Sequence, residues 1–263
     1  MAVDWSGRAS GASKKIWVAE VVGSELVFLE NGRSGAEVAQ LLADRAAMDN
    51  RIVVGLDFAF SFPAWFLTDH GLKSVRELWA AAELHGEDWL KECAPPFWGR
   101  PGKRKPDLGD REHFRATERL ADPIRGVMPK SVFQIGGAGA VGTGSVRGMP
   151  TLANLSAAGF SIWPFDPPAL PLVVEIYPRT LTRDVRKSSQ MGCEEYLFAR
   201  NLISAPSLRT RAASSEDAFD AAVSALVMWK HRSQLAELDD QSDEVSHLEG
   251  AIWYPIGQPR DTT

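Results

Sequence analysis

Five acidic residues stand in segments whose other residues are mostly apolar: Asp4, Asp57, Glu175, Asp217 and Asp220. Burying an ionised carboxylate without a partner costs free energy, so any one of them alone is readily explained as a hydrogen-bonded structural group. Together they could bind cations, because oxygen ligands without His or Cys suit Mg²⁺ or Mn²⁺. Two such ions roughly 3.5–4 Å apart stabilise the attacking and leaving oxygens in phosphodiester hydrolysis.

Three of these acids follow the ends of predicted strands. The run RIVVGLDFAFSFP (51–63) predicts a strand covered on both faces, with Asp57 near its carboxyl end, and Asp4 and Glu175 hold similar positions in their own short apolar runs. Ligands of open α/β sheets bind at this end of the strands. If Asp4 and Asp57 are neighbours about 4 Å apart, they repel by about 4 kcal/mol at an effective dielectric of 20. They then need a shared proton or a cation.

The order of predicted elements favours such a neighbourhood. Residues 1–30 predict a three-stranded antiparallel meander, with strands over 15–22 and 25–30 joined by a tight Gly-Ser turn. Residues 34–48 predict a helix that begins with a capping box. A strand–helix–strand crossover then makes the Asp57 strand parallel to an earlier strand.

The remaining two acids lie on the most strongly predicted helix, residues 215–231. Asp217 and Asp220 are three positions apart and project to one side of its first turn. Acids in a first turn complement the helix dipole, which explains Asp217. That explanation fits Asp220 poorly, because Asp220 shares a helix face with Val223 and Val227.

The segment between the Asp57 strand and residue 170 predicts helices and loops. A helix over 75–92 is expected to be broken at Gly86. The loop 94–110 carries a basic cluster at 100–105, which is either a solvated loop or an arm that contacts phosphate, with Phe97 and Trp98 as stacking groups.

A glycine-rich segment, residues 136–148, contains the pattern G-x-G-x-x-G. A dinucleotide site would continue into a helix and show an acid about twenty residues later. Pro150 is expected to end such a helix early, and residues 155–161 contain no acid. The pattern therefore argues only weakly for a dinucleotide, and backbone N–H groups donated to a phosphate remain an alternative.

Composition limits the class of protein. The 263 residues are 44% hydrophobic and 24% charged, with a net charge of −5, which excludes a broadly basic, histone-like nucleic-acid binder. Cys93 and Cys193 match no zinc or redox spacing, and no apolar run is long enough to span a bilayer. We expect one cytoplasmic domain over residues 1–263, with no membrane contact and an insertion at about 64–170.

Four motifs together resemble a poorly characterised bacterial family of predicted RNase H-like nucleases, in the superfamily of the Holliday-junction resolvases. They are VDWSG (3–7), GLDFAFSFP (55–63), EIYPR (175–179) and DAFDAAVSA (217–225). The resemblance implies an α/β fold with an RNase H-like mixed sheet. The first three strands are antiparallel, the later ones parallel, helices flank the sheet, and the large insertion precedes the last strand.

The resemblance also implies roles at a two-metal site for Mg²⁺ or Mn²⁺. Asp4 would bridge the ions, Asp57 and Asp220 would each hold one, and Asp217 or Glu175 would complete the shell or position water. Phosphate contacts would come from four basic residues: Arg8, Lys14, Arg179 and Arg183.

The expected function is divalent-metal-dependent nuclease activity on nucleic acid of unspecified type. The glycine-rich segment and the negative net charge favour an alternative on the same fold, a phosphohydrolase or phosphotransferase of small nucleotides. A catalytically inactive nucleic-acid-binding module is the third possibility.

Overall fold

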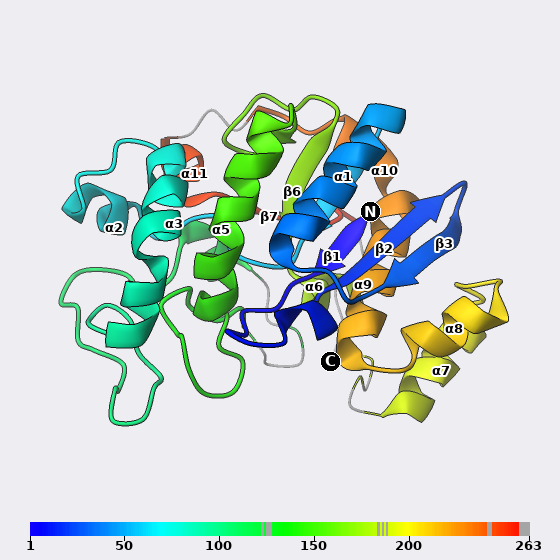
Figure 1. The fold of residues 1–263 in the computed structure, drawn as a ribbon, viewed down its shortest axis with the longest axis horizontal. Helices are drawn as coiled ribbons and strands as arrows, with labels where there is room; N and C mark the ends of the chain where they lie inside the picture. The colour runs from blue at the N-terminus through cyan, green and yellow to red at the C-terminus, as the bar shows by residue number, and fades with distance from the viewer. Residues whose placement is uncertain are drawn as a thin grey trace.

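A computed structural model describes residues 1–257 except 122–123, 125–127, 183–184, 186, 188 and 241–243. The described residues form a seven-stranded mixed sheet with helices on both faces (Figure 1). The strand order is β3-β2-β1-β4-β6-β5, and β7 also pairs with β6. The strands are β1 (Ala2–Asp4), β2 (Trp17–Val22), β3 (Glu25–Glu30), β4 (Val53–Leu56), β5 (Ser161–Ile162), β6 (Leu172–Ile176) and β7 (Ile252–Trp253).

The first three strands form the predicted antiparallel meander. Strand β2 pairs antiparallel with both β1 and β3. The turn between β2 and β3 has positive φ at both central residues, 58° at Gly23 and 72° at Ser24. Two positive φ values match the right-handed twist of a two-residue hairpin, which explains the glycine. A short 3₁₀ turn, Ala12–Lys14, interrupts the connection from β1 to β2.

Helix α1 (Gly35–Met48) carries the chain from the meander to β4. The predicted capping box is present: Ser34 Oγ accepts from the Glu37 N–H, and the Glu37 carboxylate accepts from the Ser34 N–H. Strand β4 then runs parallel to β1 and to β6. The predicted crossover and the mixed sheet are therefore confirmed.

One edge of the sheet differs from the expectation. Strand β6 is not the last, because the later strand β7 also pairs with it in parallel. Strands β5 and β7 share the same edge: β5 pairs with the first two residues of β6, and β7 pairs with its last two. A two-residue strand is too short to show hydrophobic alternation, so the sequence pattern could not identify β7.

The helices form a layer on each face of the sheet. In Figure 1, α1, α3 and α5 lie in front of the sheet and α9 lies behind it. Beyond α1, the helices are α2 (Ala64–Asp69), α3 (Val75–Glu92), α4 (Ala116–Leu120), α5 (Gly142–Ala157), α6 (Pro178–Thr182), α7 (Gln190–Ala199), α8 (Pro206–Ala212), α9 (Glu216–Lys230), α10 (Arg232–Ala236) and α11 (Glu244–Glu249). None of those found in the described part of the chain has the length and apolar content needed to cross a membrane.

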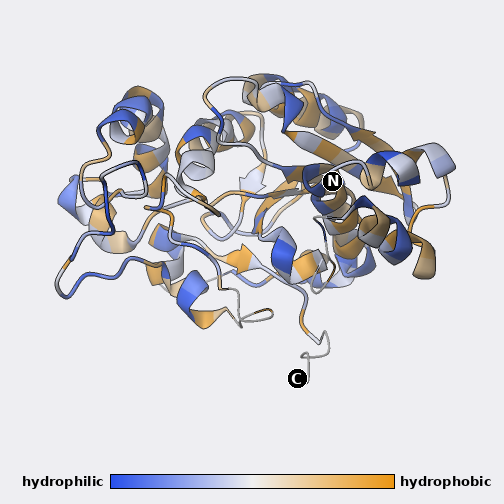
Figure 2. Cartoon of the chain, turned by 90° about the horizontal axis from the view of Figure 1, so that it is seen from below, coloured by the Kyte–Doolittle hydropathy of each residue, from blue (hydrophilic) through white to orange (hydrophobic). Residues whose placement is uncertain are grey.

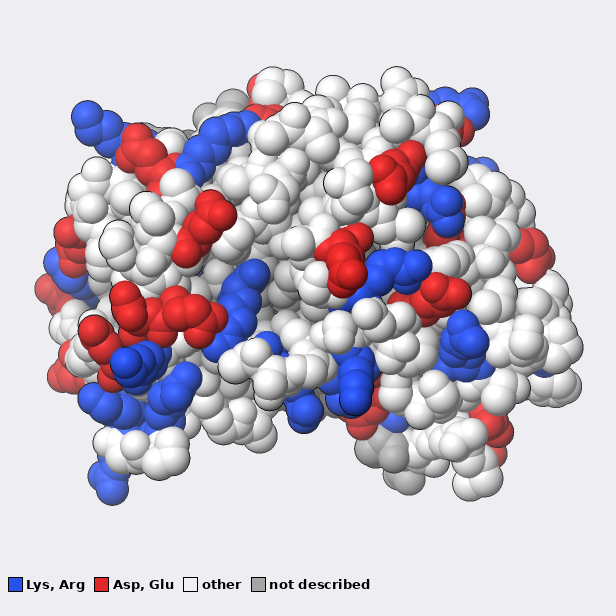
Figure 3. Space-filling model, in the orientation of Figure 1, with Lys and Arg blue, Asp and Glu red and all other residues white. Residues whose placement is uncertain are grey.

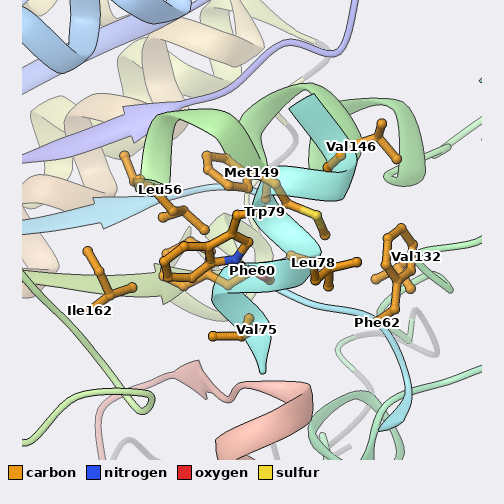
Figure 4. Close-up of a cluster of buried hydrophobic side chains, with 14 of the residues drawn as sticks. Leu56, Phe60, Phe62, Val75, Leu78, Trp79, Val132, Val146, Met149 and Ile162 are labelled. Atoms are coloured by element: carbon orange, nitrogen blue, oxygen red, sulfur yellow. Dashed lines mark hydrogen bonds between the residues drawn. The ribbon is translucent and has the colours of Figure 1, made fainter. Parts of the chain in front are cut away.

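Two apolar cores lie on the two faces of the sheet, and the strands between them are among the most hydrophobic segments (Figure 2). The core under α3 and α5 is rich in aromatic rings, including Phe60, Phe62 and Trp79 (Figure 4). The indole N–H of Trp79 donates to the Phe60 carbonyl oxygen at 2.8 Å, so even this buried polar group is satisfied. Residues 58–62, which directly follow Asp57, are held in place by their burial in or beside this core.

Two expected helix breaks are wrong. Helix α3 continues through Gly86, where the absence of a side chain allows α5 to pack closely. An added Cβ at Gly86 would lie 2.6 Å from Val146 Cγ1. Helix α5 continues through Pro150 to Ala157, with most of its residues buried against α1, α3 and the sheet. In both helices, tertiary packing outweighs the intrinsic preference of one residue.

Candidate functional site

Three of the predicted acids come together from three separate elements. Strands β1 and β4 pair in parallel with Val3 beside Leu56, so the next residues, Asp4 and Asp57, follow side by side. The Asp57 N–H donates to the Val3 carbonyl oxygen at 3.0 Å and extends the ladder to this point. Helix α9 packs across β1 and β2 and brings Asp220 to the pair. We call these three residues the acid group.

Burial and mutual repulsion perturb all three carboxyls. Asp4 is 8% exposed, and burial, then Asp57 and Asp220, raise its pKa well above the usual value. Burial and the Asp220 charge raise the pKa of Asp57 to about 8, against a smaller lowering by a hydrogen bond with Asp4. Burial raises the pKa of Asp220 to about 6. The group therefore retains protons at neutral pH unless a cation compensates its charge.

Lys187 supplies part of the positive charge that compensates the acid group. This residue was not identified from the sequence. Its Nζ lies 2.8 Å and 2.5 Å from the two carboxylate oxygens of Asp220, and both side chains are 13% exposed. The ammonium lowers the pKa of each member of the acid group. Lys187 follows β6 in a polar segment with no periodic pattern, so no sequence signal pointed to it.

Asp217 lies at the margin of the acid group. Its Oδ2 is 3.1 Å from Lys15 Nζ, and its side chain is 31% exposed. It lies in the first turn of α9, where Ser215 caps the helix by accepting from the Ala218 N–H. Asp217 raises the pKa of Asp4 only through its charge. The position of Asp217 agrees with the interpretation from the sequence, in which a first-turn acid complements the helix dipole.

Glu175, expected to ligate a metal, raises the pKa of Asp57 through its charge, but its carboxylate is engaged by Arg115. Side chains alternate along a strand, and Glu175 points away from its neighbours Val174 and Ile176, which lie in the core under α9. Its carboxylate accepts from the guanidinium of Arg115 at 2.5 Å and 2.9 Å and from the Phe60 N–H at 2.9 Å. A carboxylate with these partners is a structural anchor.

Arg115 is fully buried and joins three segments of the chain. Besides Glu175, it donates to Glu118 at 2.6 Å and 2.7 Å and to the Glu249 carbonyl oxygen at 2.9 Å. Burial opposes its charge, but the two carboxylates outweigh burial and raise its pKa. Arg115 lies in the expected insertion, and no local pattern marks it as a partner of Glu175.

The donor chemistry of the acid group suits Mg²⁺ or Mn²⁺, because every donor is a carboxylate oxygen. Within the described ranges, no three His, Cys, Asp or Glu side chains are arranged to hold one ion. In this arrangement Asp220 is engaged by Lys187, and Asp57 is hydrogen-bonded with Asp4. For the acid group to bind an ion, Lys187 has to release Asp220, and the hydrogen bond between Asp4 and Asp57 has to break.

The predicted phosphate-binding residues are dispersed. Arg8 and Lys14 are exposed on the connection from β1 to β2. Arg179 lies in α6 with a buried Nε that finds no acceptor among the described residues, and Arg183 lies outside them. Acidic and basic side chains are interspersed on the face drawn in Figure 3.

The basic cluster at 100–105 is exposed, as a solvated loop would be. The alternative in which Phe97 and Trp98 stack on bases does not fit the structure, because both are buried, 5% and 9% exposed. Phe97 packs against Phe62 and Phe133 in the aromatic core.

A cavity of about 180 Å³ opens at the carboxyl ends of the parallel strands, next to Asp57. Residues after β1, β4 and β6 line it, together with β7, α4 and the start of α5. The glycine-rich segment contributes through Gly144, whereas Gly142 serves packing: a Cβ there would lie 2.2 Å from the Val132 carbonyl oxygen. The close backbone contact explains Gly142 of the G-x-G-x-x-G pattern, and Gly137 and Gly139 have positive φ values of 80° and 71°.

Comparisons with protein-family models, with curated proteins and with solved structures found no match to this chain.

Proposed function

We propose that this protein is a divalent-metal-dependent hydrolase of phosphodiester bonds with an RNase H-like fold. One observation carries the proposal: Asp4, Asp57 and Asp220 come from three elements and meet at the carboxyl ends of two parallel strands, where burial and their charges raise the pKa of Asp4 and of Asp57. Three buried acids with one ammonium between them destabilise the fold, so a purely structural role explains them poorly. The strand order and the position of α1 support the RNase H-like assignment.

The metal would be held by the acid group. Asp4, which is hydrogen-bonded with Asp57 and interacts electrostatically with Asp220, would hold the metal together with these two residues. A bound Mg²⁺ or Mn²⁺ would activate water and stabilise the charge that develops on the phosphate oxygens. Lys187 would leave Asp220 and become available to contact a phosphate oxygen, since an ammonium suits that role.

Two alternatives differ in what the acid group does. A hydrolase or phosphotransferase of small nucleotides would use the same group, and the cavity beside Asp57 favours it over an enzyme that needs a long basic groove. A non-catalytic nucleic-acid-binding module would keep the fold without binding metal at these residues.

Calorimetric titration of Mn²⁺ tests the proposal. We expect the wild type to bind Mn²⁺ and Asp57→Asn to lose most of this affinity, because Asn removes one anionic ligand. Asp217→Asn is the matched control, because it removes a nearby acid on α9 that is paired with Lys15. This variant is expected to retain the Mn²⁺ affinity of the wild type within about threefold.

Cleavage is then measured on single-stranded, double-stranded and branched nucleic acids and on nucleotides, with Mg²⁺, Mn²⁺ or EDTA. Cleavage that needs the metal and disappears in Asp57→Asn supports the proposal. Absence of Mn²⁺ binding, or equal binding by Asp57→Asn, refutes it.

A further inference from the structure

The cavity beside Asp57 has the size of one aromatic ring system. Its volume is about 180 Å³. A cavity of about 150 Å³ in another protein accommodates one benzene molecule, so the space here holds a slightly larger flat ring and not a base pair. It lies where a ligand of a parallel sheet is expected, and it adjoins the acid group through Asp57.

The lining favours a neutral, flat ring over a bare phosphate. Its charged residues are three acids and two bases: Asp57, Glu118, Glu175, Arg115 and Lys130. Arg115 is already engaged by two of these acids. The lining therefore has no surplus of positive charge for an anion. Trp5 and Tyr177, both half-buried, provide aromatic surface, which suits stacking.

Residues of the lining also carry hydrogen-bond donors close to the cavity. The indole Nε1 of Trp5 is buried and finds no acceptor among the described residues, although a buried indole N–H normally has one. Val141, at the start of α5, provides no side-chain cap for the first turn. The Gly142 N–H already donates to a carbonyl oxygen outside the helix, which leaves the N–H groups of Thr143 and Gly144 without a partner within the helix. Ring nitrogens and carbonyl oxygens of a nucleobase are suitable acceptors.

We propose that this cavity binds one unpaired nucleobase, so that the enzyme acts on a nucleotide whose base is free of a partner. This inference rests on the proposed function and specifies its substrate. The substrate is either the unpaired end of a strand, hydrolysed at a phosphodiester bond, or a mononucleotide, which is a substrate of the alternative small-nucleotide phosphohydrolase. In both cases the base lies in the cavity and its phosphate lies toward Asp57. A base inside a continuous duplex does not reach the cavity.

A cavity-filling variant tests the proposal without touching the acid group. At Gly144 an added Cβ would lie 3.9 Å from the nearest atoms, Gly7 N and Trp5 Cδ1, so the Cβ of Gly144→Leu makes ordinary van der Waals contact without a clash. Ala157→Leu is the matched control, because it adds a similar side chain to the same helix at an exposed position away from the cavity.

Binding of adenosine is measured by NMR in EDTA, so that the result does not depend on a metal. We expect the Trp5 indole N–H signal, assigned by its loss in Trp5→Phe, to shift on addition of adenosine. Gly144→Leu should weaken adenosine binding at least about fivefold, the minimum expected for loss of one stacked base at about 1 kcal/mol, and Ala157→Leu should not. Ribose 5-phosphate should bind at least about tenfold more weakly than adenosine.

Equal binding by Gly144→Leu and wild type, an unmoved Trp5 signal, or equal binding of ribose 5-phosphate overturns the base pocket. These results leave the Mn²⁺ titration unaffected, so failure of the pocket and failure of the metal site are distinguishable. With Mn²⁺, cleavage of adenosine nucleotides alone identifies a mononucleotide substrate, and cleavage of frayed but not blunt duplex ends identifies a strand end. Preferential cleavage inside a continuous duplex also overturns the proposal.

Discussion

Replacement of Asp57 by Asn tests the electrostatics of the acid group directly, because Asn copies the shape of the protonated acid and cannot ionise. The pKa of Asp57 is raised to about 8, first by burial and then by Asp220, whereas an unfolded chain has a value near 3.9. The folded state therefore holds a proton that the unfolded state releases. Below about pH 4 both states are protonated, and between about pH 4 and pH 8 the wild type loses stability as pH rises.

The size of this effect follows from the two pKa values. Each unit of difference corresponds to about 1.4 kcal/mol, so an ionisable Asp57 lowers the free energy of unfolding by about 5 kcal/mol at pH 8, about 3 at pH 6 and less than about 1 at pH 4. In EDTA, we expect Asp57→Asn to exceed the wild type in stability by amounts of this order. Urea unfolding at the three pH values measures the difference.

Asp217→Asn serves again as the control. It removes a partly exposed ion pair with Lys15, which is worth less than about 1 kcal/mol, and no gain toward pH 8 is expected. If Asp57→Asn has the wild-type stability at both pH 4 and pH 8, or is less stable at pH 8, the repulsion inferred for the acid group is refuted.

Three further predictions concern the surroundings of the site. Arg115→Met leaves two buried carboxylates unpaired and should lower the free energy of unfolding by about 3–5 kcal/mol in urea; a loss below about 1 would contradict its anchoring role. Gly86→Ala should destabilise the protein by about 1–3 kcal/mol through contact with Val146, and should instead stabilise it slightly in a Val146→Ala background, where only helix propensity remains; equal effects in the two backgrounds would refute the contact. Lys187→Met should raise the pKa of Asp220 above about 6, measured by ¹³C NMR titration of the carboxyl, and an unchanged value would show that the ion pair is absent in solution.

The sequence predicted those parts of the site that depend on local pattern. The apolar runs before Asp4 and Asp57 specify strands because buried strands are short, continuous and rich in β-branched residues. The helix between them, with its capping box, makes the strands parallel, and parallel neighbours bring their carboxyl ends together. For Asp220, the apolar face of α9 already indicated burial against the sheet.

The missed parts depend on contacts between distant segments. Glu175 has the same local pattern as Asp57, and only the register of β6 and the guanidinium of Arg115 give it a different role. Arg115 and Lys187 are ordinary basic residues in polar segments, and their burial is decided by folding of the whole chain. Gly86 suggested a helix break because its propensity is poor, whereas its small size serves the contact with α5.

The position of β7 makes completion of the site a late event in folding. Glu249 accepts from the N–H groups of Ala64 and Ala116 at 2.8 Å and 2.6 Å, and Ile252 forms part of the cavity wall. These contacts close loops of 185 and 133 residues. Long-range closures of this kind slow folding. During synthesis, β1, β4 and β6 can assemble first, but the cavity wall cannot close before residue 253 has left the ribosome.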